Sequence, residues 1–371
     1  MKCTKGFLPE QTERGEAEMQ ELCAECGVPS YFSSQHLWLN NGDIINATLT
    51  HERLTFLEFE FFDHVIHETE RALGTSIERI VIATAQAAVR MYVASLLPEG
   101  VGDMIKAGTL SLDNLHGGLI EVAALTGFGR YEERESRYQQ DEEDYYVVSI
   151  KRPFSVYLTA ATHGAAYEAM LGYDHDIRYS EVAPGVYEIT AFPSSHPEDL
   201  RERLAPRMYE HRDGDLELER CGTCGVPKLL QNLSWNVEEG TITSKITGRR
   251  LSISGPNLIM PIFEELEKEL GKEIPALVVD AVRDYARGGL LPQGLLEDEE
   301  AFRHELAMRG LGNLGSLQVD ARELDMLLRN VCLPPVVVGI VQGMHEELYG
   351  VRSRVEWSVD EAGDLRVALS A

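Results

Sequence analysis

Hydrophobic and polar residues follow the same order in the two halves of this chain. In the first half, alternating residues over 44–56 indicate strands, and apolar residues at helical spacing follow over 59–73. In the second half, the corresponding stretches are 242–253 and 258–270. A glycine stands directly after each helical stretch, as is common where a helix ends. Each half is therefore predicted to begin with strands that lead into helices.

The remainder of each half extends this match. A second apolar helix is expected over 77–97 in the first half and over 274–290 in the second, and a proline follows each. A strand over 145–150 then leads to a long helix over 154–171 and to a final hairpin over 176–191. This order predicts an α+β fold with two duplicated domains, each an antiparallel sheet covered by helices.

A short cysteine motif opens both halves. The pattern Cys-x-x-Cys-Gly-Val-Pro begins at Cys23 and returns at Cys221, 198 positions later. The flanking residues follow the same spacing closely, because Trp38 matches Trp235. These repeats predict an internal duplication with an N-terminal knuckle on each copy. The predicted segments are a disordered lead-in at 1–20, a first domain at 21–193, a linker at 194–219 and a second domain at 220–371.

The charge balance restricts the partners. Lys and Arg number 34 against 61 Asp and Glu, which gives a formal net charge of −27. Nucleic acids and anionic membrane surfaces attract positive surfaces, so neither is an expected partner. No apolar run approaches the ~20 residues that span a bilayer, so no membrane insertion is expected. The polar N-terminus lacks the apolar centre of a signal peptide, so we expect a cytoplasmic location with reduced cysteines.

Four of the six cysteines stand in the two motifs, and their spacing predicts a metal site. Cysteines three positions apart can chelate one ion, and two such pairs complete a tetrahedral set of thiolates. We therefore predict that Cys23, Cys26, Cys221 and Cys224 meet at a pseudo-twofold axis and hold one structural Zn²⁺. Iron is the alternative, because thiolate ligands alone do not separate the two metals. The alternative without a metal is that the four cysteines are reduced thiols on ordinary turns.

Other candidate chemistry is weaker. His64 and His67 stand three residues apart on a predicted helix, but they do not match the spacing of zinc peptidases. An exposed polar helix face explains them without a metal. The sequence contains no nucleophile elbow, phosphate loop or dinucleotide fingerprint, and nothing in it argues for catalysis.

One element resembles a known family. A Gly-Phe-Gly-Arg-Tyr element at 127–131 precedes a strand, and a long helix ending at Gly172 leads into a terminal hairpin. The second half carries weaker forms at 310–312 and 346–350. Both halves are similar to the hydrocarbon-binding 4-vinyl-reductase domain, a branch of the superfamily that includes TRAPP tethering subunits and haem-dependent nitric-oxide sensors. The resemblance implies a pocket for a small hydrophobic molecule between helices and sheet. The cysteine cluster that many members carry near their last strands is missing from 176–192.

Four residues are candidates for binding such a molecule. Phe59 and Phe62 belong to an aromatic patch at a strand–helix junction, which suits a planar ligand but equally suits a core. Arg130 is expected to anchor an acidic ligand group. His163 introduces a polar group into an otherwise apolar helix. These residues place the expected pocket in the first half.

The sequence thus favours non-catalytic binding of a small hydrophobic molecule, in sensing or delivery, by a zinc-clipped tandem protein. Two alternatives stay open. One is a redox or metal-dependent enzyme with iron in the four-cysteine site. The other is an assembly or scaffold protein that holds partners on its outer helices. A homodimer or a protein partner is compatible with each of these functions.

Overall fold

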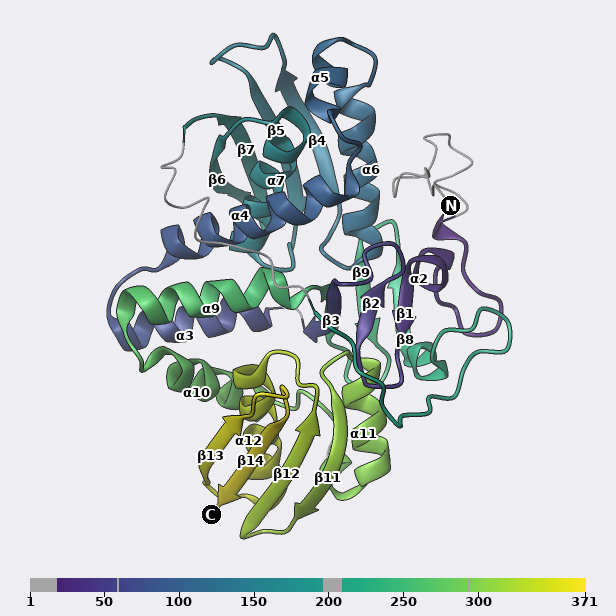
Figure 1. Cartoon of the computed structure of the whole chain (residues 1–371). Coiled ribbons are helices and arrows are strands. Elements are labelled where there is room, and N and C mark those ends of the chain that lie inside the picture. Colours follow the sequence, from purple (N-terminus) through teal and green to yellow (C-terminus); the bar gives the residue numbers. More distant parts are fainter. Residues whose placement is uncertain (1–18, 59, 196–208, 293) are drawn as a thin grey trace. The chain divides into compact units, whose positions relative to one another are not determined.

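The computed structural model describes residues 19–58, 60–195, 209–292 and 294–371, and Figure 1 colours them along the sequence. They form helices and antiparallel sheets, which confirms the predicted α+β class. Among these residues, no helix is both long and apolar enough to cross a membrane. The predicted lead-in at 1–20 falls almost entirely outside the described residues, as does much of the predicted linker.

The chain folds into two compact units, and each unit is made of several segments that alternate along the sequence. The first unit comprises Ile77–Arg207, Trp235–Ile242 and Met1–Glu21, as far as these are described. The second unit comprises Leu22–Ser76, Met208–Ser234 and Thr243–Ala371, with the same restriction. The domain boundaries predicted above follow the repeat in the sequence and stay a prediction.

The first unit is a four-stranded antiparallel sheet with helices. The strand order is β4-β5-β7-β6, and helix α7 packs against α4 and against strands β6 and β7. Small residues let two of these elements approach, because a Cβ at Gly164 of α7 would lie 2.9 Å from Gln86 Nε2 of α4. The elements are α4 (Glu78–Leu96), α5 (Val101–Lys106), α6 (Leu112–Leu125), β4 (Tyr131–Arg137), β5 (Tyr145–Lys151), α7 (Val156–Leu171), β6 (His175–Ala183) and β7 (Val186–Pro193).

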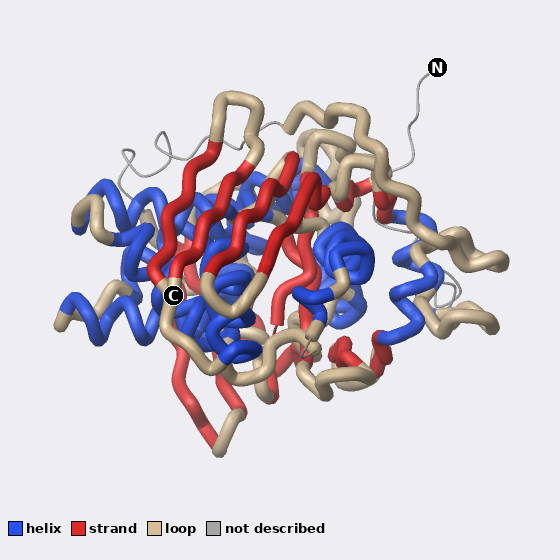
Figure 2. The backbone as a smooth tube through the Cα atoms, turned by 90° about the horizontal axis from the view of Figure 1, so that it is seen from below, coloured by secondary structure: helices blue, strands red, loops and turns tan. Residues whose placement is uncertain are grey.

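The second unit contains a sheet with the same topology. Its order is β11-β12-β14-β13, and α12 packs against β13, β14 and α10. Figure 2 shows these strands side by side near the C-terminus, with helices along one side. The elements of this sheet and its helices are α9 (Pro256–Leu270), α10 (Ile274–Ala286), η2 (Leu295–Glu297), α11 (Glu299–Met308), β11 (Asn313–Val319), β12 (Glu323–Arg329), α12 (Pro334–Tyr349), β13 (Arg354–Val359) and β14 (Leu365–Ser370).

A further sheet combines strands from both halves of the sequence. Its order is β1-β2-β3-β10-β9-β8, and β3 and β10 pair antiparallel at its centre. Phe56 lies opposite Ile253, which stands at the matching position of the repeated sequence. The elements are α2 (Ser30–Gln35), β1 (His36–Trp38), β2 (Ile44–Asn46), β3 (Arg53–Glu58), α3 (Phe61–Leu73), η1 (Lys228–Asn232), β8 (Leu233–Asn236), β9 (Thr241–Ser244) and β10 (Arg250–Ser254).

Most helices predicted from periodicity are found where expected. The stretches over 59–73, 77–97, 154–171, 258–270 and 274–290 correspond to α3, α4, α7, α9 and α10. The short helix α5 was not predicted, because six residues give too little periodicity to detect.

The two halves exchange their first hairpins. In the second unit, Gly42 of the β1–β2 turn abuts Gly312, and a Cβ at Gly42 would lie 2.4 Å from the Gly312 carbonyl carbon. In the first unit, Gly240 of the β8–β9 turn abuts Gly129, whose N–H donates to the Gly240 carbonyl at 3.0 Å. Each unit is therefore completed by a hairpin from the other half of the sequence.

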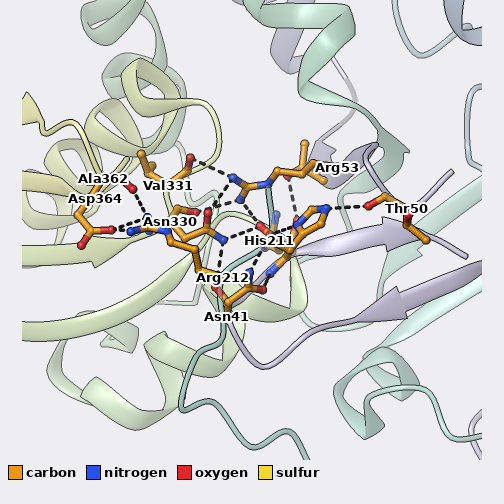
Figure 3. Close-up of polar contacts among 12 residues, drawn as sticks. Asn41, Thr50, Arg53, His211, Arg212, Asn330, Val331, Ala362 and Asp364 are labelled. Atoms are coloured by element: carbon orange, nitrogen blue, oxygen red, sulfur yellow. Dashed lines mark hydrogen bonds and ion pairs between the residues drawn. The ribbon is translucent and has the colours of Figure 1, made fainter. Parts of the chain in front are cut away.

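A buried polar network attaches the residues that lead to the second cysteine motif (Figure 3). Asp43 and Arg53 form an ion pair at 2.6 Å, with side chains only 1% and 3% exposed. His211 lies 2.6 Å from Asp43 Oδ2 through Nδ1 and 2.7 Å from the Thr50 carbonyl through Nε2. Asn330 donates to Asp43 Oδ1 at 2.8 Å. The network thus joins the first hairpin, the described end of the predicted linker and the β12–α12 loop within the second unit.

Aromatic side chains stack in the segment that follows the first cysteine motif. The His36 ring lies 4.7 Å from Phe32, which in turn stacks on Phe56 at 6.1 Å. Burial lowers the pKa of His36 to about 3, so this ring is neutral in the folded protein at neutral pH.

The glycine contacts predict a large cost for a single methyl group. Gly42→Ala forces a Cβ into the Gly312 backbone and places alanine at a φ of +83°. We expect a loss of about 3 kcal/mol or more, because steric overlap and left-handed backbone strain add. Gly74→Ala is the matched control: its φ is +69° but nothing lies within 4 Å of the added Cβ, so we expect about 1 kcal/mol. Urea unfolding followed by tryptophan fluorescence measures both, and equal losses would contradict the close approach.

The buried histidine predicts a pH dependence of stability. The unfolded His36 takes up a proton below its ordinary pKa of about 6.5, whereas the folded ring resists protonation down to about 3. Stability is therefore full above pH 7 and falls as the pH is lowered. Between pH 7 and 5.5 we expect His36 to account for about 1 kcal/mol of the loss. His36→Gln should flatten the decline in unfolding free energy by that amount, and an unchanged slope would exclude this role.

Candidate metal centre

Each cysteine motif folds into the same turn. The Cys23 N–H donates to the Val28 carbonyl at 2.9 Å, and the Cys221 N–H donates to the Val226 carbonyl at 2.9 Å. Gly27 and Gly225 adopt φ values of +73° and +78°. Glycine reaches this left-handed conformation without the cost that a Cβ brings, which explains its place in both motifs.

The two turns meet within the second unit. Cys23 Sγ lies 3.8 Å from Cys221 Sγ, and Cys26 Sγ lies 3.5 Å from Cys224 Sγ. All four sulfur atoms lie within 4.8 Å of one another. A tetrahedral ion with metal–sulfur bonds of about 2.3 Å separates its ligands by about 3.8 Å. The four cysteines therefore lie close enough to hold a metal ion, as the repeat predicted.

The protonation of the thiols is consistent with a cation site. Burial raises the pKa of Cys26 and of Cys224, since a thiolate loses solvation there. The Cys26 backbone N–H stabilises the Cys23 thiolate and lowers the pKa of that group to about 7. A bound divalent cation would compensate the negative charge of the buried thiolates and so stabilise them, since cysteines bind metals as thiolates.

Contacts around the sulfur atoms also join the two turns. The Glu25 carboxylate of the first turn accepts from Thr223 Oγ1 at 2.7 Å and from the Gly222 N–H at 3.2 Å. Arg220 donates to the Gly225 carbonyl at 3.0 Å and to the Trp38 carbonyl at 2.9 Å. These bonds orient the second turn on the first hairpin independently of a metal.

The histidines of α3 do not build a second centre. Among the described residues, the four cysteines are the sole group of three or more His, Cys, Asp or Glu side chains gathered tightly enough for an ion. His64 lies against Tyr285 of α10 with ring centroids 5.3 Å apart, and burial lowers its pKa. His67 is exposed and pairs with Glu70 at 3.5 Å.

The predicted ligand-binding residues lie in different surroundings. Phe59 falls outside the described residues. Phe62 is fully buried in the core of the second unit, where α3 packs on α10. Arg130 belongs to the first unit and pairs with Glu121 at 2.6 Å. His163 is buried in the first unit, and its role in binding stays a prediction.

A group of rings around His163 was not predicted. His116, Tyr146, Tyr167 and His175 join His163 in what we name the histidine–tyrosine cluster. Tyr146 and Tyr167 stack at 3.8 Å, and the His116 ring lies 4.9 Å from Tyr167 and 5.7 Å from His163. The members come from α6, β5, α7 and β6, so no local sequence pattern reveals them.

A cleft opens beside this cluster in the first unit. Its volume is about 370 Å³, and two half-buried tyrosines, Tyr138 and Tyr173, line it. The Tyr173 ring stacks on His175 at 4.8 Å, so the cleft wall is continuous with the cluster. The remaining lining residues are Lys106, Gln140, Asp141, Glu142 and Pro193.

The chain shows little similarity to known proteins. No family model matches the chain, and no curated protein matches it. One similar solved structure is a point mutant of the H-NOX of T. tengcongensis, with 13% identity, 31% of this chain and 73% of that chain covered, and a TM-score of 0.22. Another is a Cs H-NOX mutant that carries the unnatural amino acid 4-cyano-L-phenylalanine, with 13% identity, 31% and 72% coverage, and a TM-score of 0.23. Scores this low do not establish a shared fold.

Proposed function

We propose that this protein is a non-catalytic binding protein of two repeated halves, clipped together by one structural zinc ion. The observation that carries the proposal is the meeting of four cysteine sulfurs within 4.8 Å, two from each half. Four thiolates fill a tetrahedral zinc ion and leave no position for a reacting water, which favours a structural role. A bond between residues this far apart in the chain also reduces the entropy of the unfolded state.

The binding function is assigned to the first unit. Its cleft of about 370 Å³ falls in the range of small-molecule sites. Tyr138, Tyr173 and Pro193 offer apolar surfaces, while Lys106 and Asp141 stand at the same opening. Aromatic walls favour a planar, largely apolar ligand, and the charged residues favour one with a polar substituent. The proposed ligand is therefore a small hydrophobic molecule, as the family resemblance implies.

The zinc proposal predicts one metal per chain. Mass spectrometry of natively purified protein should find one zinc ion, and both Cys23→Ser and Cys221→Ser should lose it. If loss of the metal lowers the unfolding free energy by about 3 kcal/mol, the midpoint of thermal unfolding falls by about 6–12 °C in a unit of this size. We expect each variant to show a decrease of at least this size. Cys332→Ala, which alters a buried cysteine outside the motifs, should keep the zinc.

The other outcomes are distinguishable. Iron with visible absorption would favour the redox alternative. A metal content that is only halved in each variant would show that the two motifs bind separately. Protein without any metal would exclude the clip.

The cleft predicts binding of an apolar probe through its tyrosines. Nile red, a planar neutral dye, should fluoresce on binding to the full chain. Tyr138→Ala and Tyr173→Ala should each weaken binding by about threefold to tenfold, because one aromatic contact contributes about 0.5–1.5 kcal/mol. Tyr145→Ala is the control, since its hydroxyl pairs with Glu135 on the strand surface and it does not line the cleft. Equal affinity in all four proteins would place the dye elsewhere.

A further inference from the structure

Two buried histidines in the histidine–tyrosine cluster have their protons fixed by acceptors. His116 Nδ1 lies 2.7 Å from Glu133 Oε1, and His163 Nε2 lies 3.0 Å from the Tyr146 carbonyl oxygen. The Glu133 side chain is 53% exposed and pairs with His116 as a carboxylate. Both partners only accept, so Nδ1 of His116 and Nε2 of His163 carry the hydrogens. In the neutral rings, the lone pairs therefore stand on His116 Nε2 and His163 Nδ1.

The lone pair of His163 lacks a protein partner. His163 is 2% exposed, and its Nδ1 is buried without a hydrogen bond in the part of the chain that the structure describes. His116 is 3% exposed, and its hydrogen bond to Glu133 uses Nδ1. A buried acceptor left without a donor is costly, so its presence calls for a reason.

The ring separation suits a shared ion. The His116 and His163 rings have centroids 5.7 Å apart and an interplanar angle of 58°. Two imidazoles that bind one ion through nitrogens at about 2.0–2.1 Å have centroids about 5–6 Å apart. Histidine ligands of metals usually donate their other N–H to a carboxylate or a backbone carbonyl, and Glu133 and Tyr146 supply these two acceptors.

We propose that His116 and His163 bind a first-row transition-metal ion that accepts imidazole ligands, such as Zn²⁺ or Co²⁺, inside the first unit. Tyr167 lies beside both rings, at 4.9 Å from His116 and 5.2 Å from His163. Its hydroxyl or water completes the coordination. Because two imidazoles leave positions open, this site accepts a further ligand, unlike the four-cysteine set. It is independent of the zinc clip and lies in the other unit.

The second unit offers a natural contrast. Counting back from the glycine that ends each long helix, Val341 stands at the position of His163. The second unit does hold a buried histidine in α12, His345, whose Nε2 lies 2.8 Å from the Asp320 carbonyl. Its Nδ1 also lacks a hydrogen bond among the described residues, but its aromatic neighbour is Tyr349 rather than a second histidine. A single imidazole of this kind does not form a metal site.

Cobalt titration of the full-length, reduced and metal-free chain tests the proposal. We expect two ions per chain: one with thiolate-to-cobalt absorption and one without it. His116→Gln and His163→Gln should each abolish the second ion, because glutamine still donates to the same acceptor but lacks the imidazole lone pair. Glu133→Gln should weaken the second ion by roughly 10- to 100-fold, as loss of an outer partner does elsewhere. His345→Gln is the matched control and should bind both ions.

The thiolate absorption separates the possible failures. If it persists in His116→Gln and His163→Gln, the four-cysteine site and the second unit are intact, and a far-UV circular dichroism spectrum equal to that of the unaltered protein shows that the first unit is folded as well. One ion per chain in the unaltered protein, or a second ion that survives both substitutions, overturns the proposal without touching the zinc clip. Imidazole ¹⁵N chemical shifts give a further readout: zinc should move His116 Nε2 and His163 Nδ1 and leave their protonated partners nearly unchanged. Shifts at other histidines instead would also overturn it.

Discussion

The antiparallel pairing of β3 with β10 is the interaction on which the rest of the second unit depends. Phe56 faces Ile253, and these two residues occupy matching positions of the repeat. On either side, Thr55 faces Ser254 and Leu57 faces Ser252. Such reciprocity is the property of a two-fold axis: the residue on the axis meets its own counterpart, and each of its neighbours meets the counterpart of the other neighbour. The strand ladder therefore imposes a local symmetry on everything attached to its ends.

The cysteine motifs follow from this symmetry. Cys23 Sγ lies 3.8 Å from Cys221 Sγ and Cys26 Sγ lies 3.5 Å from Cys224 Sγ, so each sulfur again lies close to its counterpart. Two identical chelating turns related by a two-fold axis supply four ligands without further adjustment. The Glu25–Thr223 contact breaks the symmetry, because matching positions carry a carboxylate in one turn and a hydroxyl in the other. The asymmetric bond aligns the turns, and the symmetric sulfurs are the proposed metal ligands.

The exchange of hairpins makes neither half of the sequence self-sufficient. The turn at Gly42 belongs to the first half of the sequence, but it packs against Gly312, directly before β11 of the second half. The turn at Gly240 does the same for Gly129. These contacts join residues far apart in the sequence, and such topologies fold slowly because long loops close before the contacts form. A clip between the two halves would shorten that search.

Sequence reasoning succeeded where a signal is local or repeated. The helices appear in the hydrophobic period, and the joint cysteine site could be predicted because the motif occurs twice. The hairpin exchange could not be predicted, because both halves carry the same turn. A hairpin that packs on its own half and one that packs on the other half have the same hydrophobic pattern in the sequence. The cleft tyrosines Tyr138 and Tyr173 and the pairing of His116 with His163 were also missed. They come from separate elements, and no periodicity links a helix face to a strand that lies beside it only after folding.

The two units differ most in their interiors. Around the long helix of the first unit stand His163, Tyr146 and His175, and the corresponding residues of the second unit are Val341, Leu324 and Ser353. The shared feature is a buried glutamate: Glu168 Oε1 accepts the His175 N–H at 3.0 Å, and Glu346 Oε1 accepts the Ser353 N–H at 2.9 Å. The glutamate fixes the chain after the helix in both units and so belongs to the scaffold. At these three positions the first unit carries polar rings where the second carries two apolar residues and a serine, and burying the imidazoles costs desolvation. This cost is consistent with the binding proposed for the first unit.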